Sequence, residues 1–217
     1  MPLQTRVSPF DDAGFLFELK LDGFRALAVI EHGRAQMFSR NGHPFASFAD
    51  LASDVAAAVR DTHGARRRDC LPGQERQAAI PGPAVPPRGI PCFFAFDILV
   101  SHGKDWRRDA LIDRKLELRR VLASVPARSR LRYVDHVEGT GIALFDDVCK
   151  LDLEGVVAKE KRAPYITERE TSTWFKIRNR KYSQMAGREK LFDRERHKEP
   201  VPAWHSCALA CAELEDL

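Results

Sequence analysis

The sequence predicts an α+β domain whose largely antiparallel sheets are flanked by helices, and two observations lead to this class. Apolar runs of the kind that form strands recur along the chain, at residues 15–40, 91–100, 131–137, 155–160 and 173–177. Apolar residues at helical spacing lie between them, at residues 46–60, 111–123 and 141–151. Strands mixed with helices in this way are typical of α+β domains.

Turn residues divide the first apolar region. Asp22-Gly23 and His32-Gly33 are turn dipeptides, so residues 15–40 are interpreted as three short strands. The Ala-rich segment Ala46–Arg60 then predicts a helix. Residues 91–100 are apolar on both faces and predict one buried strand.

The second half of the chain continues the alternation. Leu111–Ala123 is predicted to be an amphipathic helix, because Leu111, Leu118 and Leu122 lie near one stripe. The remaining elements are expected in this order: a strand at Leu131–Val137, a helix at Gly141–Leu151, and strands at Gly155–Glu160 and Thr173–Ile177.

Residues 64–90 interrupt the pattern. They contain three consecutive arginines and prolines at 72, 81, 83, 86 and 87. A proline inside a central strand removes a ladder hydrogen bond, so we predict a disordered segment without a strand here. The domain is therefore expected to span residues 1–192, with 64–90 anomalous, and residues 193–217 are expected to form a charged C-terminal tail.

Composition restricts the function only weakly. The 217 residues include 35 Lys and Arg and 31 Asp and Glu, a net charge of +4 that does not by itself indicate a nucleic-acid partner. Five cysteines, an odd number without a C-x-x-C pair, predict reduced thiols. No apolar run approaches the roughly 20 residues that cross a bilayer, so we expect a cytoplasmic protein without a membrane partner.

Lys20 lies in the run E-L-K-L-D-G-F-R at residues 18–25, between a predicted strand and the Asp22-Gly23 turn. An amine is a nucleophile only without its proton, and burial and nearby cations lower its pKa toward that state. A lone K-x-D-G is more often a solvated lysine in a surface hairpin.

Four further motifs favour the functional interpretation. They are S-R-N-G at 39–42, F-A-F-D-I-L at 94–99, E-G-V-V-A-K at 154–159 and W-F-K-I-R at 174–178. This ordered series resembles the nucleotidyltransferase motifs of ATP-dependent DNA ligases, above all the ligase domain of bacterial end-joining ligases and their short stand-alone relatives. The resemblance covers residues 8–192 and implies an ATP-grasp-like nucleotidyltransferase fold.

The resemblance also implies a reaction and a site. Lys20 would form lysyl–AMP from ATP, and the AMP would pass to a DNA 5′-phosphate for nick sealing in repair and recombination. The residues expected to bind ATP are Glu18, Arg25, Arg40, Phe96, Lys159, Lys176 and Arg178. Glu154 is the expected ligand of Mg²⁺ or Mn²⁺, since hard cations prefer carboxylate oxygens. The expected partners are nicked double-stranded DNA and a separate DNA-clamping or end-joining protein.

The chain departs from the family pattern in two ways. It contains no Asp-Gly-Glu, a motif whose glutamate helps the family bind metal and nucleotide. The residues after Arg178 are also too few for an OB-fold domain, so none is expected. Two alternatives stay open: a degenerate, non-catalytic nucleotide- or DNA-binding remnant, and an RNA ligase or capping-type nucleotidyltransferase.

Overall fold

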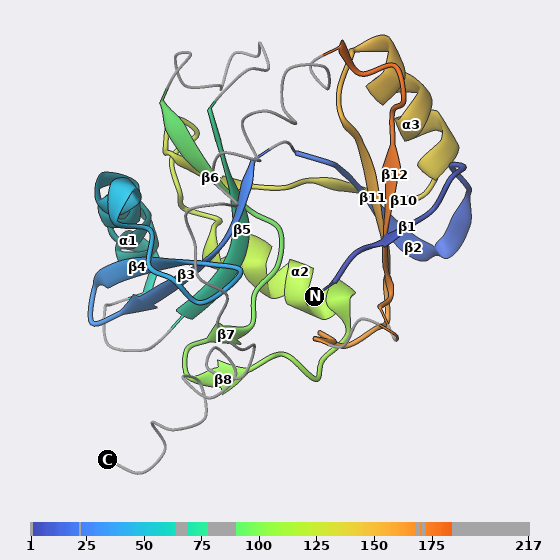
Figure 1. The fold of residues 1–217 in the computed structure, drawn as a ribbon. Coiled ribbons are helices and arrows are strands. Elements are labelled where there is room, and N and C mark those ends of the chain that lie inside the picture. The colour runs from blue at the N-terminus through green and yellow to red at the C-terminus, as the bar shows by residue number, and fades with distance from the viewer. Residues whose placement is uncertain are drawn as a thin grey trace.

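Two sheets form the centre of the protein in the computed structural model, which describes residues 2–21, 23–63, 69–77, 90–167, 170 and 172–183 (Figure 1). The five-stranded sheet has the order β1 (Gln4–Thr5), β12 (Trp174–Arg178), β11 (Gly155–Glu160), β2 (Asp12–Leu19) and β10 (His136–Gly139). All its pairs are antiparallel except β1 with β12.

The seven-stranded sheet has the order β4 (Arg34–Ser39), β3 (Phe24–Glu31), β5 (Asp69–Gln77), β6 (Pro91–Ala95) and β9 (Leu131–Tyr133). Strands β7 (Val100–Ser101) and β8 (Lys104–Asp105) extend it beside β5. Its one parallel pair is β6 with β9. The predicted α+β class with largely antiparallel sheets is therefore confirmed in the described residues.

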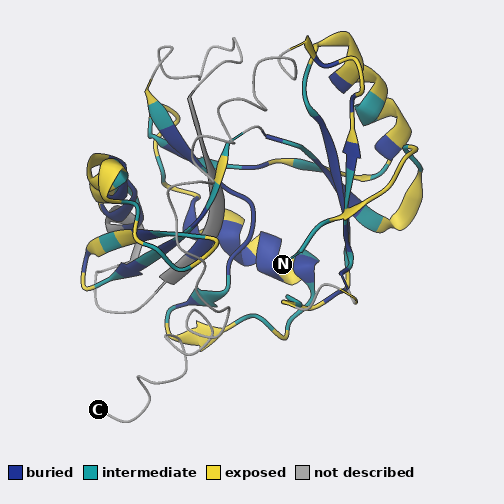
Figure 2. Cartoon of the chain, viewed as in Figure 1, coloured by how far each residue is buried: buried dark blue, intermediate teal, exposed yellow. Residues whose placement is uncertain are grey.

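Two helices cover the outer sides of the sheets, and a third contacts both sheets. The 3₁₀ turn η1 (Ala46–Phe48) leads into α1 (Ala49–His63), and the other helices are α2 (Leu111–Val121) and α3 (Gly141–Lys150). Apolar residues of α1 and α2 pack on the seven-stranded sheet, while α3 packs on the five-stranded sheet. A third apolar cluster, which includes Leu16, Phe96 and Trp174, fills the space between the sheets. Figure 2 shows these inward faces as buried and the outer helix faces as exposed.

The segment around Lys20 is not a hairpin. The strands on either side of it, β2 and β3, belong to different sheets, so the chain crosses from one sheet to the other between Leu19 and Phe24. Asp22 lies outside the described residues. The predicted Asp22-Gly23 turn therefore falls partly outside them. Because β2 and β3 belong to different sheets, Lys20 lies where the sheets meet.

The prediction that residues 64–90 contain no strand was wrong for Asp69–Gln77. These residues form β5, which pairs with β3 along Asp69–Glu75 and with β6 along Gly73–Gln77. Pro72 falls between the pairing with β6 and the single pairing of Cys70 with β7, so on that side no ladder contact is lost there. Residues 64–68 and 78–89 lie outside the described residues, as does the predicted tail at 193–217.

Two predicted strands end earlier or divide. The strand expected at 91–100 ends at Ala95, and Phe96 begins the irregular stretch that leads to β7. The strand expected at Leu131–Val137 is two strands, because β9 joins the seven-stranded sheet and β10 joins the five-stranded sheet. Within the described residues no helix is long and apolar enough to cross a membrane. Cys92 and Cys149 are free thiols, as expected.

Candidate active site

Strands β2, β11 and β12 send alternate side chains into the space between the sheets. Phe17, Val156 and Ile177 pack toward α3, so their neighbours along each strand face the other sheet. Register aligns these inward residues in rows: Leu16 with Lys159 and Trp174, then Glu18 with Val157 and Lys176. This alternation gathers residues from three distant motifs onto one surface.

Lys20 extends these rows by one position. Its backbone N–H donates to the carbonyl of Gly155 at 2.8 Å, and Gly155 is paired with Arg178. Its side-chain amine donates to Oε1 of Glu154, and both side chains are only 14% exposed. The nucleophile expected from the sequence and the metal ligand expected from the sequence are thus direct neighbours.

The backbone conformation at residue 155, beside Lys20 and Arg178, requires a glycine. Its φ is +150°, and a Cβ built there would lie 2.2 Å from the carbonyl oxygen of Ile177. A side chain would therefore push β11 away from β12 or displace the carbonyl that holds Lys20. The glycine of E-G-V-V-A-K has a steric reason.

The pKa of Lys20 is lowered from its ordinary value. Burial is the largest cause, Glu154 opposes it, and the charges of Arg178 and Arg25 lower the pKa further. The pKa of Lys176 is also lowered, first by burial and then by Arg178, Lys20, Arg25 and Arg40. The charges of five cations therefore act on one another near Glu154, an arrangement that favours a polyanionic ligand.

Glu154 is suited to a cation. Its second carboxylate oxygen, Oε2, is buried and has no hydrogen-bond partner among the described residues. A buried carboxylate oxygen without a partner is costly, and Mg²⁺ or Mn²⁺ would satisfy it. No group of three or more metal-binding side chains occurs in the part of the chain that the structure describes.

A small pocket opens beside Lys20, between the two sheets. It encloses about 30 Å³, and the residues that line it include Glu18, Arg25, Phe96, Lys159 and Trp174. The Nζ atom of Lys159 lies 4.4 Å from the ring centroid of Phe96 and 4.1 Å from that of Trp174. This volume holds about one water molecule, so a nucleobase can enter only if the lining side chains move apart.

Phe96 is held by the residue that follows it. The Asp97 carboxylate accepts hydrogen bonds from Arg114 at 2.8 and 3.0 Å, and both side chains are completely buried. Arg114 also donates to the carbonyls of Asp109 and Ala163. The bidentate pair fixes the chain where β6 ends, which keeps the Phe96 ring against Trp174 at a centroid distance of 5.7 Å.

The carboxylate of Glu18 accepts hydrogen bonds from the ammonium groups of two lysines. Lys159 donates to its Oε2 atom, and Lys115 of α2 donates to its Oε1 atom at 2.8 Å. The pKa of Glu18 is lowered, since the two lysine charges together outweigh burial, which is the largest single effect and acts in the opposite direction. The glutamate is therefore ionised although it is buried.

A strand is present where the resemblance implies one with Asp-Gly-Glu, but it does not contain that motif. Strand β5 lies between β3 and β6 and reads Leu71-Pro72-Gly73-Gln74. Gln74 is opposite Arg25 on one side and Phe94 on the other. In the register of β5, Gln74 is therefore the residue paired with Arg25, one of the residues expected to bind ATP.

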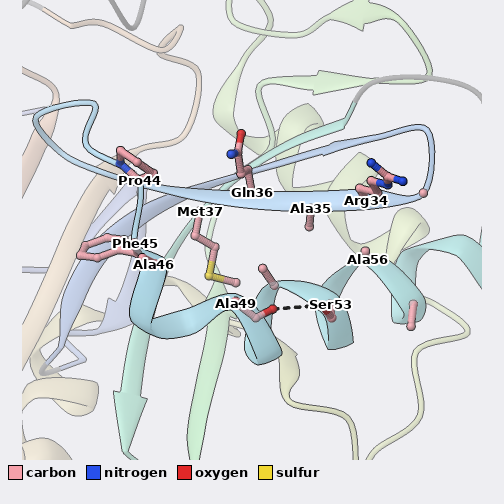
Figure 3. A pocket seen from close by; sticks show the side chains of 13 residues that line it. Arg34, Ala35, Gln36, Met37, Pro44, Phe45, Ala46, Ala49, Ser53 and Ala56 are labelled. Carbon is pink, nitrogen blue, oxygen red and sulfur yellow. Dashed lines mark hydrogen bonds between the residues drawn. The ribbon is translucent and has the colours of Figure 1, made fainter.

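A larger groove of about 660 Å³ lies elsewhere, between β4 and α1 (Figure 3). Its walls are made mainly by small side chains, including Ala35, Ala49, Ala52 and Ala56. None of the predicted site residues lines it, and it has no carboxylate or amine that could carry chemistry. We therefore place the candidate active site at Lys20.

The predicted site residues converge, but sequence reasoning missed two neighbours. Trp174 was recognised only as part of a motif, and it forms a wall of the pocket. Lys115 was not singled out, although it lies four residues after Leu111 and three before Leu118 on the buried side of α2. A lysine on the apolar stripe of a helix was the available signal.

Comparison with known proteins identifies the family. A family model described as "ATP dependent DNA ligase domain" matches residues 2–178. The multifunctional non-homologous end joining protein LigD of Mycolicibacterium smegmatis is 28% identical over 183 residues, covering 78% of this chain and 22% of LigD. The SPbeta prophage-derived DNA ligase-like protein LigB of Bacillus subtilis is 24% identical over 198 residues, covering 85% of this chain and 68% of LigB.

Solved structures agree with this. The ligase domain of LigD from M. tuberculosis superposes with a TM-score of 0.64 at 25% identity, covering 82% of this chain and 58% of that one. A mycobacterial DNA ligase D complexed with ATP and MES has the same fold, with a TM-score of 0.65 at 24% identity, covering 82% of this chain and 60% of that one. The chain thus spans about a fifth of the length of the M. smegmatis LigD and less than two thirds of these solved ligase structures.

Proposed function

Because this chain belongs to the family of ATP-dependent DNA ligase domains, we propose that it is the adenylating part of a DNA ligase and that Lys20 is its nucleophile. The observation that carries the proposal is the position of Lys20: a largely buried amine, surrounded by cations, beside a pocket with aromatic walls. The solved DNA ligase D in complex with ATP supports ATP as the substrate.

In the first step the neutral amine of Lys20 attacks the α-phosphorus of ATP. A nitrogen–phosphorus bond forms, the bond to the β-phosphate oxygen breaks, pyrophosphate leaves and the amine proton passes to solvent. Arg25, Arg40, Lys176 and Arg178 would stabilise the negative charge of the phosphates. The base would occupy the pocket, where Phe96 offers a ring for stacking and Glu18 and Lys159 offer an acceptor and a donor.

In the second step an oxygen of a DNA 5′-phosphate attacks the phosphorus of lysyl–AMP. An oxygen–phosphorus bond forms and the nitrogen–phosphorus bond breaks, so that adenylated DNA leaves and Lys20 regains its electron pair and takes a proton from solvent. Nick sealing would follow when the 3′-hydroxyl displaces AMP, as expected for the repair of DNA ends. Glu154 would hold Mg²⁺ or Mn²⁺, which when bound offsets the negative charge on the phosphate. The proposed partners are nicked DNA and a DNA-clamping or end-joining protein that is a separate chain.

The test is incubation with α-labelled ATP and Mg²⁺, followed by a denaturing gel. We expect the label to stay on the protein through an acid-labile, base-stable bond, as a phosphoramidate requires. Lys20→Ala should abolish the label, whereas Lys150→Ala, which removes an exposed lysine of α3, should leave it unchanged. A labelled Lys20→Ala protein would refute the assignment, and a preference for GTP would favour a capping-type enzyme.

The second candidate is a non-catalytic nucleotide-binding remnant. The observation that favours it is β5, where Gln74 is the residue paired with Arg25, and the described residues contain no group of three or more side chains that could hold a metal. An unmodified chain that binds ATP but never becomes labelled, with Mg²⁺ or with Mn²⁺, would establish this candidate over the enzyme.

A further inference from the structure

A buried lysine of α2 bonds to two of the residues that line the pocket, Glu18 and Val134. Lys115 is 1% exposed, and it donates to Glu18 Oε1 at 2.8 Å and to the carbonyl of Val134 at 2.7 Å. Its Nζ atom lies 4.3 Å from the ring centroid of Tyr133. One side chain thus connects α2, strand β2 of the five-stranded sheet and the end of β9 in the seven-stranded sheet.

The two lysines on Glu18 differ in how firmly they hold their protons. Burial alone would lower the pKa of Lys115, but Glu18 and Tyr133 together raise it above its ordinary value. The pKa of Lys159 is lowered to about 8: burial is the main cause, Glu18 opposes it, the charge of Lys115 lowers the pKa further, and Asp97 raises it. Lys115 therefore holds its proton more firmly than Lys159 does.

The other charged groups around this network do not replace Lys115. His136 on β10 lies near it and has a lowered pKa, mainly because of burial and then because of Lys115. The Cζ atom of Arg119 lies 5.0 Å from the ring centroid of Tyr133, and the Arg119 side chain donates a hydrogen bond to exposed Asp135. Among the described residues, the cations that donate a hydrogen bond to Glu18 are Lys115 and Lys159.

We propose that Lys115 is a positioning residue for the nucleotide pocket, which holds the Glu18 carboxylate in place and so leaves Lys159 free to exchange Glu18 for a ligand. The inference rests on the proposed function for the identity of that ligand, the base of ATP. Because Lys115 donates to Oε1 of Glu18, the glutamate keeps Lys115 as a counter-ion when a ligand draws Lys159 away. Without Lys115, the same movement would leave a buried carboxylate with no counter-ion.

The arrangement can be tested without ATP. Trp174 reports on Lys159 because the ammonium lies 4.1 Å from its ring centroid, and its fluorescence can be isolated by changing the other two tryptophans, Trp106 and Trp204, to phenylalanine. We expect a fluorescence transition near pH 8 in this background. Lys115→Met should move the midpoint upward by about one pH unit, because it removes a nearby positive charge.

A matched control separates positioning from packing. Leu118→Ala shortens a fully buried side chain one turn further along α2, in the core of the seven-stranded sheet and away from Glu18. It should reduce stability and leave the midpoint near pH 8. Lys115→Gln keeps a hydrogen-bond donor without the charge and should shift the midpoint in the same direction as methionine, so it serves if the methionine variant does not fold.

The labelling reaction supplies the second readout. Lys115→Met should raise the ATP concentration that gives half-maximal labelling by about tenfold, with the rate at saturating ATP within about threefold of the unmodified chain. Lys115→Arg, which keeps the charge, should recover part of the loss. An unmoved midpoint in both uncharged variants, or a lower saturated rate with an unchanged ATP requirement, would overturn the proposal. A chain that is never labelled refutes the enzyme, while the fluorescence titration still decides the role of Lys115.

Discussion

The side-chain amine of Lys20 donates a hydrogen bond to Oε1 of Glu154, a residue 134 positions further along the chain. The carboxylate favours the charged form of the lysine, whereas burial, Arg178 and Arg25 favour the neutral form. The amine is therefore held at the mouth of the pocket in an environment where its proton is easier to remove than in water. Four predictions follow from the residues around this pair.

Removing the positive charge of Arg178 should raise the pKa of Lys20. The folded-state pKa of Lys20 lies below the ordinary 10.5, so its reactivity toward a neutral acylating reagent should rise with pH and reach half its maximum below 10.5. Arg178→Gln removes one of the charges that lower the pKa, so the midpoint should move upward. Arg180→Gln, an exposed neighbour, should leave it unchanged. Mass spectrometry of the Lys20 peptide measures the midpoint, and a shift to lower pH in Arg178→Gln would contradict the electrostatic account.

Lys176→Ala should slow labelling without removing nucleotide binding. Lys176 lies on β12 in the row of Glu18, within the cation cluster, and its charge is suited to the phosphate in the transition state. At saturating ATP the rate should fall by roughly 100-fold or more. Lys161→Ala, which breaks a surface ion pair with Glu138, is the control and should keep the original rate. If Lys176→Ala is labelled as fast as the unmodified chain, Lys176 is only a partly exposed strand residue.

Gln74→Glu should increase labelling. The substitution places a carboxylate on β5 in the row of Arg25 and Phe94, where it can add a second hard oxygen for a cation. We expect the initial rate of labelling at limiting Mg²⁺ to rise about tenfold. Gln77→Glu makes the same charge change on the same strand but on its opposite face, and should have little effect. An equal response to both substitutions would mean that the added charge acts without regard to position.

Gly155→Ala should destabilise the protein. The added Cβ would lie 2.2 Å from the carbonyl oxygen of Ile177, and the backbone has a positive φ that alanine rarely adopts. The free energy of unfolding should fall by about 2–4 kcal/mol, measured by urea denaturation. At Gly14 the nearest atom to an added Cβ is a side-chain oxygen of Asp12 at 3.1 Å, so Gly14→Ala should cost less than about 1 kcal/mol. Similar losses at the two glycines would show that the close approach in β11 can relax.

Much of the five-stranded sheet could be predicted because its signals are local. Leu16 and Glu18 alternate on β2 and Lys20 continues the alternation just after it, while Trp174, Lys176 and Arg178 alternate on β12; both patterns are visible in the sequence. A period of two places such residues on one face whatever the strands pair with. The motif residues and the face they share were therefore predictable, and strand β11 has the predicted bounds, Gly155–Glu160.

The tertiary structure decided which sheet each strand joins and which side chains meet, because both depend on which distant segments pair. No local pattern states that β2 and β3 enter different sheets, and that separation places Lys20 between them. Strand β5 has weak propensity and contains Pro72, yet it forms because β3 and β6 supply its partners on both sides. The position of Lys115 on the apolar stripe of its helix is visible in the sequence, but only the packing of α2 against β2 gives it Glu18 as a counter-ion. Local periodicity thus determined which side chains share a face of each strand, while long-range pairing determined which residues those side chains contact.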